Sequence, residues 1–181
     1  DKIGTTISST NVRPSLQDIQ KNLEKFVGKI EQIPPKFSAI KVNGKRAYRL
    51  ARKKTNFSLN SRTVFIETLK IKKQIDNDHC SFECICSKGT YIRALARDLG
   101  EAMNCFGHIY ELRRTHVGKF SHKCSILLDL SEKLIHSSEI LKNILPIEIA
   151  LKSLPFINLN KKQELAIKNG QNICLDELNI D

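Results

Sequence analysis

The sequence has 181 residues, of which 40% are hydrophobic, 30 are lysine or arginine and 19 are aspartate or glutamate, so its formal net charge is +11. This apolar content excludes a disordered chain, and the length suits one ordinary domain with a small addition. No apolar run approaches the ~20 residues of a membrane span, and no signal peptide is visible. The charge favours a polyanionic partner, either nucleic acid or an anionic membrane surface.

The first predicted element is an amphipathic helix over residues 15–27. Ser15 can cap this helix, Asp18 suits its third position, and Gly28 can end it. Apolar residues at helical spacing are expected to face a core: Leu16, Ile19, Leu23, Phe26 and Val27. Such a stripe indicates a core contact more often than a partner-binding helix.

A basic stretch with little regular structure follows over residues 30–62. Pro34 and Pro35 oppose regular structure, and the pair Asn43-Gly44 is a turn signal. Six cations and one tyrosine then crowd into ten residues: Lys45, Arg46, Tyr48, Arg49, Arg52, Lys53 and Lys54. Basic residues with interleaved aromatic rings suit a surface that follows an RNA backbone and stacks on bases, although a run of charges is also typical of a solvated face.

A hairpin is predicted from strands over residues 64–75 and 80–86, joined by a turn at 76–78. The six cysteines show no paired zinc-ligand spacing, and reduced, buried thiols in a cytoplasmic protein are expected: Cys80, Cys84, Cys86, Cys105, Cys124 and Cys174. His79 and His108 leave a metal site open as the alternative.

A second helix is predicted after Gly89, with Arg93 and Arg97 on one face because they are four residues apart. Its buried stripe is expected to contain six residues: Ile92, Leu95, Ala96, Leu99, Ala102 and Met103. Residues 104–107 break this helix, and a further strand is predicted over residues 109–117.

The composition changes from residue 125 onward, where only short elements are predicted. They are helical pieces over 131–145, a helix that begins at Pro146, a strand over 154–159, a helix capped by Asn160 that runs to Lys168 and ends at Gly170, and a strand over 172–175. We therefore expect two parts, residues 1–125 and residues 126–181, of which the second is an incomplete small domain.

The run from Cys86 to Arg93 joins a predicted strand to a predicted helix. Over eight residues it contains a lysine, a glycine, a hydroxyl group, an aromatic ring and an arginine. These groups can approach a phosphate backbone and stack on a base. A simple turn would explain Gly89 and Thr90 but not the whole cluster.

Two stretches resemble one family. Residues 31–52 resemble the Pro-Pro-x-aromatic-Ser-Ala-x-Lys-x-x-Gly-x-x-x-Tyr-x-x-Ala-Arg signature of TruB-type tRNA pseudouridine synthases, and residues 86–120 resemble that family's Cys-Ser-Lys-Gly-Thr-Tyr-Ile-Arg block and its continuation. The resemblance implies isomerisation of a T-loop uridine of tRNA to pseudouridine by a monomeric protein that needs no cofactor and no metal. It also implies an α+β fold with a mixed, largely antiparallel sheet and packed helices, whose antiparallel part the hairpin signal supports independently.

The resemblance assigns roles to individual residues. Arg93 is expected to be catalytic by pairing with and orienting the catalytic aspartate, Tyr91 to stack on the flipped uracil, and Leu112 to line the uracil pocket. Residues 34–54 match a loop that folds over the T-arm of tRNA. Contacts with RNA are expected from eight cations: Lys36, Lys41, Lys45, Arg46, Arg52, Lys88, Arg113 and Arg114.

One family motif is not found in this sequence. The nucleophilic aspartate of the family lies in a Gly-His-x-Gly-Thr-Leu-Asp segment, and residues 1–125 correspond to the second half of the catalytic domain. We therefore expect this chain alone to be inactive and, with an exposed sheet edge, prone to self-association. The alternative from another class is a non-catalytic RNA-binding or RNA-folding module that uses the same basic surface.

Overall fold

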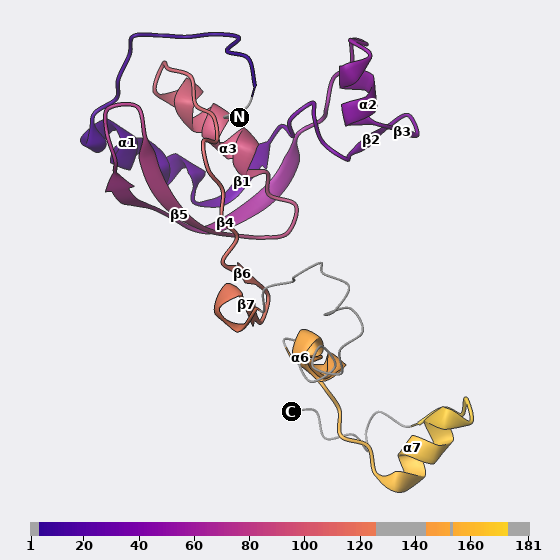
Figure 1. Ribbon diagram of the computed structural model, residues 1–181. Helices are drawn as coiled ribbons and strands as arrows, with labels where there is room; N and C mark the ends of the chain where they lie inside the picture. The colour runs from indigo at the N-terminus through magenta and orange to yellow at the C-terminus, as the bar shows by residue number, and fades with distance from the viewer. Residues whose placement is uncertain (1–3, 126–143, 153, 174–181) are drawn as a thin grey trace, which may run out of the picture. The chain divides into compact units, whose positions relative to one another are not determined.

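The computed structural model describes residues 4–125, 144–152 and 154–173. The chain divides into two units, residues 1–112 and residues 113–181. The first unit contains the sheet and the helices that carry the candidate site (Figure 1).

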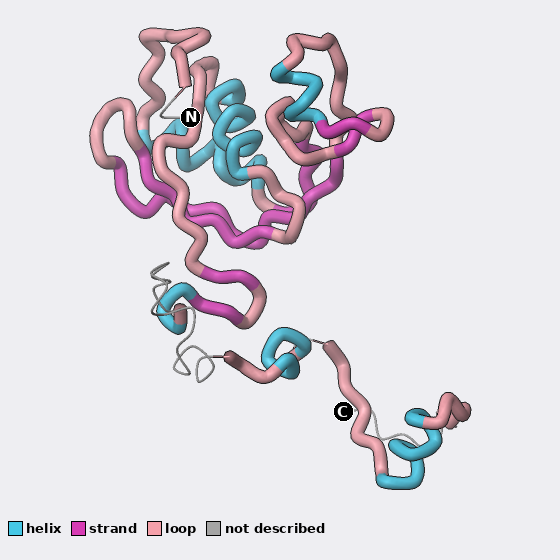
Figure 2. The backbone as a smooth tube through the Cα atoms, turned by 45° about the vertical axis from the view of Figure 1, so that its right-hand side comes forward, coloured by secondary structure: helices cyan, strands magenta, loops and turns pink. Residues whose placement is uncertain are grey.

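An antiparallel sheet of three strands, in the order β1-β4-β5, lies at the centre of the first unit. Strand β1 (Gly28–Gln32) pairs with the start of β4 (Arg62–Gln74), and β5 (Cys80–Cys86) pairs with the remainder of β4. The helices α1 (Leu16–Leu23) and α3 (Ile92–Ala102) lie on one side of this sheet, as Figures 1 and 2 show. This arrangement of helices on an antiparallel sheet confirms the predicted α+β class.

The core lies between this face of the sheet and the two helices. Each of α1, β4 and α3 contributes two buried residues to it: Ile19, Leu23, Ile66, Leu69, Leu95 and Leu99. As the middle strand of the sheet, β4 contributes Ile66 and Leu69 to this core, and Ile66 is fully buried. Burial of six aliphatic side chains contributes roughly 1.5–3 kcal/mol each before the entropy of ordering is subtracted.

The cap predicted for the first helix is confirmed, but its end is not. Ser15 and Asp18 form a reciprocal capping box, in which each side chain accepts the other residue's backbone N–H. The chain then tightens into a 3₁₀ turn, η1 (Glu24–Phe26), and Val27 is extended. Leu16 and Val27 are therefore wrongly predicted as core residues, since both are 44% exposed at the ends of this segment.

The predicted hairpin of β4 and β5 is confirmed together with its turn. The Asp76 carboxylate accepts the backbone N–H groups of Asp78 and His79, both at 2.7 Å, and also contacts the His79 ring. Asp78 in turn forms an ion pair with Arg13. These contacts lower the pKa of Asp76 below its usual range, mainly through the Asp78 N–H and the His79 ring.

We expect acid to weaken this hairpin. A carboxylate whose pKa is lowered by folding stabilises the folded state above its ordinary pKa of 3.8, and this contribution is lost as the pH falls through the lower, folded-state pKa. Asp76→Asn keeps an acceptor for both N–H groups but has no charge to titrate. Urea midpoints measured between about pH 7 and about pH 3 should therefore fall less for this variant than for the parent protein. Glu101→Gln on α3 is the control, and equal pH dependence in the parent and Asp76→Asn proteins would contradict the prediction.

The cysteines of β5 pack as small apolar side chains. Cys80, Cys84 and Cys86 are half-buried and lie against the core. Burial, with a smaller effect of the neighbouring Cys86, raises the pKa of the Cys84 thiol to about 12. Burial likewise raises the pKa of Cys80 and Cys105. Thiols with raised pKa stay protonated at neutral pH and are poor nucleophiles.

Helix α3 is confirmed, with a buried face that differs from the predicted stripe. Leu95 and Leu99 are buried as predicted, but Ala102 is exposed. Ala94 and Gly100, which were not predicted, are buried instead. The prediction used only the apolar side chains of the helix, whereas the segments that pack on α3 determine which of its residues are buried.

Gly100 is buried because the chain returns across α3 at very short range. A Cβ atom added at Gly100 would meet the backbone N of Gly107 at 2.4 Å, and one added at Gly107 would meet the carbonyl oxygen of Ala96 at 2.1 Å. The segment predicted only to break the helix therefore also packs its backbone directly on it. This contact requires glycine on both sides.

The strand predicted over residues 109–117 is wrong for most of its length. Only β6 (His116–Val117) is a strand, and it pairs with β7 (Phe120–Ser121) in a short hairpin followed by a 3₁₀ turn, η2 (His122–Cys124). Residues 109–115 have no regular structure, because no strand of the described residues pairs with them. A strand-like composition is therefore not sufficient to form a strand without a pairing partner.

The second unit also contains two short helices, α6 (Ile147–Leu151) and α7 (Lys161–Lys168). Asn160 caps α7 as predicted and forms a capping box with Gln163, whereas Pro146 precedes α6 as its cap instead of being its first residue. The strand predicted over 154–159 is wrong, since only a single bridge occurs there, at Ile157. The helical pieces predicted from residue 131 lie almost entirely outside the described residues, as does the end of the strand predicted over 172–175.

Candidate catalytic and RNA-binding site

The candidate site lies where β1 ends and α3 begins. The turn between β5 and α3 contains Gly89 at a φ of 87°, and Lys88 is exposed beside it. Ser87 holds this turn against the sheet, because its Oγ accepts the Phe65 N–H at 3.1 Å and its own N–H donates to the Phe65 carbonyl at 2.8 Å. Gly89 therefore lies in a turn, as predicted, and this turn places Tyr91 directly before α3.

Tyr91 is the N-cap residue of α3 and is half-buried. Its backbone N–H donates to Oε1 of Gln32, the last residue of β1, at 2.8 Å. The residue predicted to stack on a base is therefore anchored through its backbone to a strand that lies far away in the sequence.

Two arginines of α3 reach one loop. The Arg93 Nη2 donates to the Phe37 carbonyl and the Arg97 Nη2 donates to the Ile33 carbonyl, each at 2.8 Å. Arg97 is also paired with Asp98, with Nε to Oδ1 at 2.7 Å. The four-residue spacing thus places both guanidinium groups toward the loop after β1, as their shared face predicts.

The segment after this loop forms a basic projection made of β2 (Lys41–Val42), β3 (Lys45–Arg46) and α2 (Ala47–Arg52). Figures 1 and 2 show it beside the end of the sheet. The predicted turn is confirmed, with Asn43 at a φ of 48° and Gly44 at 78°, the positive values that a tight hairpin turn requires. The projection is therefore an ordered hairpin and helix, although the sequence indicated little regular structure.

Internal hydrogen bonds hold this projection together. The backbone N–H groups of Ala47 and Tyr48 donate to the Ile40 and Ser38 carbonyls at 2.7 and 3.0 Å, and Ala47 is fully buried. The Arg52 guanidinium lies 5.6 Å from the centre of the Tyr48 ring. The loop cations are all exposed: Lys36, Lys41, Lys45, Arg46 and Arg52.

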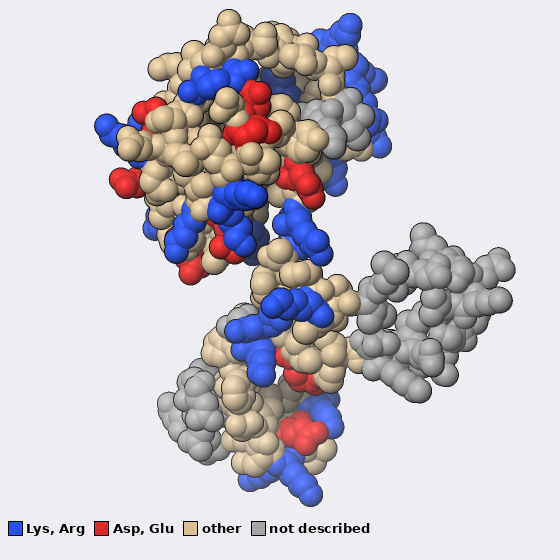
Figure 3. Space-filling model, turned by 60° about the vertical axis from the view of Figure 1, so that its left-hand side comes forward, with Lys and Arg blue, Asp and Glu red and all other residues tan. Residues whose placement is uncertain are grey.

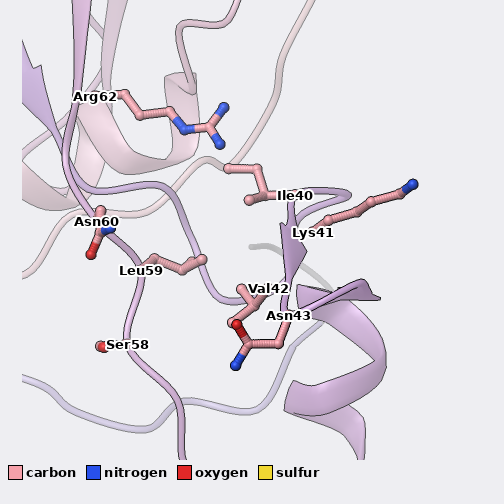
Figure 4. A pocket seen from close by; sticks show the side chains of 8 residues that line it. All are labelled: Ile40, Lys41, Val42, Asn43, Ser58, Leu59, Asn60 and Arg62. Atoms are coloured by element: carbon pink, nitrogen blue, oxygen red, sulfur yellow. The ribbon is translucent and has the colours of Figure 1, made fainter.

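An open pocket of about 230 Å³ lies between the hairpin and residues 58–62. In Figure 4 the apolar side chains of Ile40, Val42 and Leu59 lie in its middle, while the Lys41 ammonium points away from them. Of the two cations that line the pocket, Lys41 and Arg62, Lys41 therefore does not point to its centre. In Figure 3 basic and acidic side chains are interspersed over the front of the upper part, while basic ones alone follow its upper right edge.

No contact among the described residues brings the remaining predicted site residues to the start of α3. Leu112 is 59% exposed at the end of the first unit, and Arg113 and Arg114 are exposed residues of the second unit. Gln32 was not predicted as a site residue, and Arg97 was predicted only as sharing a helix face with Arg93. Gln32 could have been noticed as a polar residue at an inward-facing position of a strand.

The sequence carries the features of one known family along most of its length. The family model "TruB family pseudouridylate synthase (N terminal domain)" matches residues 1–92, and "tRNA pseudouridylate synthase B C-terminal domain" matches residues 93–152. The chain belongs to the TruB family. Proteins similar to this chain include those named tRNA pseudouridine synthase B from Caulobacter vibrioides, 41% identical over 97% of this chain and 56% of the relative, and from Ehrlichia ruminantium, 39% identical over 98% of this chain and 61% of the relative.

A solved structure supports the same membership at the level of the fold. A chain in a crystal structure of a Cbf5-Nop10-Gar1 complex matches 88% of this TruB-family chain with a TM-score of 0.65 and 25% identity, and 45% of that chain is covered. The present chain thus spans about half the length of the relatives it matches. In the described ranges, no helix has the length and apolarity to cross a bilayer, and no cluster of three or more His, Cys, Asp and Glu side chains could hold a metal ion.

Proposed function

We propose that the protein containing this chain is a tRNA pseudouridine synthase that isomerises a T-loop uridine to pseudouridine. The observation that carries the proposal is that Tyr91 and Arg93, two residues assigned by family motif, stand at the start of α3. There the Tyr91 backbone N–H donates to the Gln32 side chain of β1, and the Arg93 guanidinium donates to the Phe37 carbonyl of the loop after it. Arg93 pairs with a catalytic aspartate from outside this sequence and keeps it ionised and oriented. Tyr91 stacks on the uracil after it is flipped out of the loop, and the aspartate attacks during exchange of the glycosidic bond.

The basic projection is the part that covers the RNA. Its exposed lysines and arginines neutralise phosphates of the T-arm, while its backbone contacts hold it as a preformed hairpin. Because Arg93 also donates to Phe37, closure of this loop over RNA and placement of the catalytic arginine are linked. Leu112, Arg113 and Arg114 complete the uracil pocket and the RNA contacts in this proposal.

The test uses the full-length protein, unmodified tRNA and mass-spectrometric detection of pseudouridine. Tyr91→Leu should lower turnover far more than RNA affinity, because one stacking contact contributes about 1–3 kcal/mol to binding while the ring also orients the reacting base. Tyr110→Leu is the matched control, since Tyr110 packs edge-on against His79, with 4.8 Å between ring centres.

Two results would count against the proposal. If the full-length protein binds tRNA but forms no pseudouridine, the RNA-binding module is the correct function. If Tyr91→Leu and Tyr110→Leu turn over equally well, the role given to Tyr91 is wrong.

A further inference from the structure

Gln32 is a buried polar side chain to which the proposed function gives no role. It is 1% exposed and belongs to the largest fully buried side chains of the described residues. Its Oε1 accepts the Tyr91 N–H at 2.8 Å, while its Nε2 is buried without a hydrogen-bond partner among those residues. Since a backbone N–H can only donate, the carboxamide oxygen must be the atom that faces Tyr91.

The helices of this chain show what the hydrogen bond from Gln32 replaces. The first backbone N–H groups of a helix lack partners inside it, and in a capping box the third helical residue reaches back to the N-cap N–H. Asp18 does this in α1 and Gln163 does it in α7. In α3 the third residue is Ala94, which is 1% exposed and has no polar atom in its side chain.

We propose that Gln32 is the positioning residue for Tyr91, and that from the end of β1 it supplies the acceptor for the N-cap N–H of α3 that the third helical residue supplies in α1 and α7. This inference rests on the proposed function, because its consequence is the placement of the stacking ring and, two residues later, of Arg93. Burial of Ala94 in the core leaves no room for a glutamate or glutamine at that position. The cap must therefore come from elsewhere, and the end of β1 is the segment that lies against Tyr91.

The same residue connects the helix to the RNA-covering loop. Gln32 directly precedes Ile33, whose carbonyl accepts the Arg97 guanidinium. The start of α3 and the start of the loop are thereby fastened to each other at adjacent residues of the chain. Gln32 thus fixes where the ring stands relative to the loop that closes over the RNA.

The unpaired Nε2 of Gln32 allows a role in positioning Tyr91 to be distinguished from a role in stability alone. Gln32→Met removes this unpaired donor, which is destabilising, but it also leaves the Tyr91 N–H without its acceptor, so the two effects on the free energy of unfolding oppose each other. Gln32→Met is therefore expected to change the melting temperature of the full-length protein by less than about 4 °C. A residue kept for stability alone would cause a larger loss.

The first experiment measures amide exchange and turnover in the full-length protein for the parent, Gln32→Met and Gln74→Met. Gln74 ends β4 as Gln32 ends β1, and it serves as the matched control. We expect the Tyr91 amide to exchange at least about tenfold faster in Gln32→Met only, and kcat to fall on the order of 10–100-fold with KM changed less than about threefold. A Tyr91 amide that exchanges equally fast in all three proteins would overturn the proposal.

The second experiment is a double-mutant cycle with Tyr91→Leu. If Gln32 acts through Tyr91, Gln32→Met should lower kcat by less than about twofold in the Tyr91→Leu background. The full loss in that background would show that Gln32 acts independently and would overturn the positioning role. Absence of pseudouridine from the parent protein, with Tyr91 protection that still depends on Gln32, would refute the proposed function while supporting the cap.

Discussion

Arg93→Ala is expected to lower pseudouridine formation by the full-length protein on the order of 10²–10³-fold, with only a few-fold loss of tRNA affinity. In the proposed function this guanidinium holds the catalytic carboxylate ionised and in place, an interaction that matters most in the transition state. The alanine variant also loses the hydrogen bond to the Phe37 carbonyl, which connects the loop after β1 to α3. Single-turnover kinetics at saturating enzyme would separate the chemical step from binding.

Two further variants make the test of Arg93 specific. Arg93→Lys keeps the charge but not the planar fork, and it should fall between the parent and alanine proteins. Arg13→Ala removes an arginine that pairs with Asp78 at the opposite end of the hairpin, and its turnover should stay within a few-fold of the parent protein. Turnover by Arg93→Ala at the level of Arg13→Ala would show that this residue has no catalytic part.

Gly107→Ala is expected to cause the largest loss of stability among the substitutions considered. The added Cβ would lie 2.1 Å from the Ala96 carbonyl oxygen and 3.6 Å from the Gly100 Cα, so the returning chain would have to separate from α3. Overpacking of this kind costs about 1–3 kcal/mol, and more where only backbone can move. Chemical denaturation followed by circular dichroism measures the free energy of unfolding.

Gly44→Ala provides the control for Gly107→Ala. An added Cβ at Gly44 meets nothing within 4 Å, and its only cost is the positive φ of 78°, about 1 kcal/mol. Equal losses in the two variants would show that chain contact at Gly107 carries no special weight. Because Leu99 and Leu95 are buried on α3, a displaced return segment should also raise amide exchange along the helix.

Local signals in the sequence were sufficient for several elements. The caps at Ser15 and Asn160 were predictable because a capping box involves residues only three apart. The turn at Asn43 and Gly44 and the β4–β5 hairpin were predictable for the same reason, since their geometry depends on adjacent residues. The family motif added the roles expected of Tyr91 and Arg93, which no spacing or charge pattern could supply.

Errors arose wherever a distant segment decided the outcome. Residues 109–115 have strand-like composition, yet a strand also needs a neighbour to pair with, and the described residues provide none. Gly100 carries no apolar side chain, so periodicity could not mark it as buried; the return of Gly107 across α3 decides this. Likewise, Arg97 was predictable as sharing a face with Arg93 but not as a partner of the Ile33 carbonyl.

The sequence by itself determined the family, the α+β class, the caps at Ser15 and Asn160 and the β4–β5 hairpin, because these depend on motifs or on residues that are close together along the chain. Only the tertiary structure decided how α3 is held. Its N-terminal cap comes from Gln32, which lies 59 residues before Tyr91, and its arginines bind carbonyl groups of the loop after β1. Contacts between segments so far apart depend on the packing of β1 against β4 and of α3 on the sheet, which no local pattern encodes.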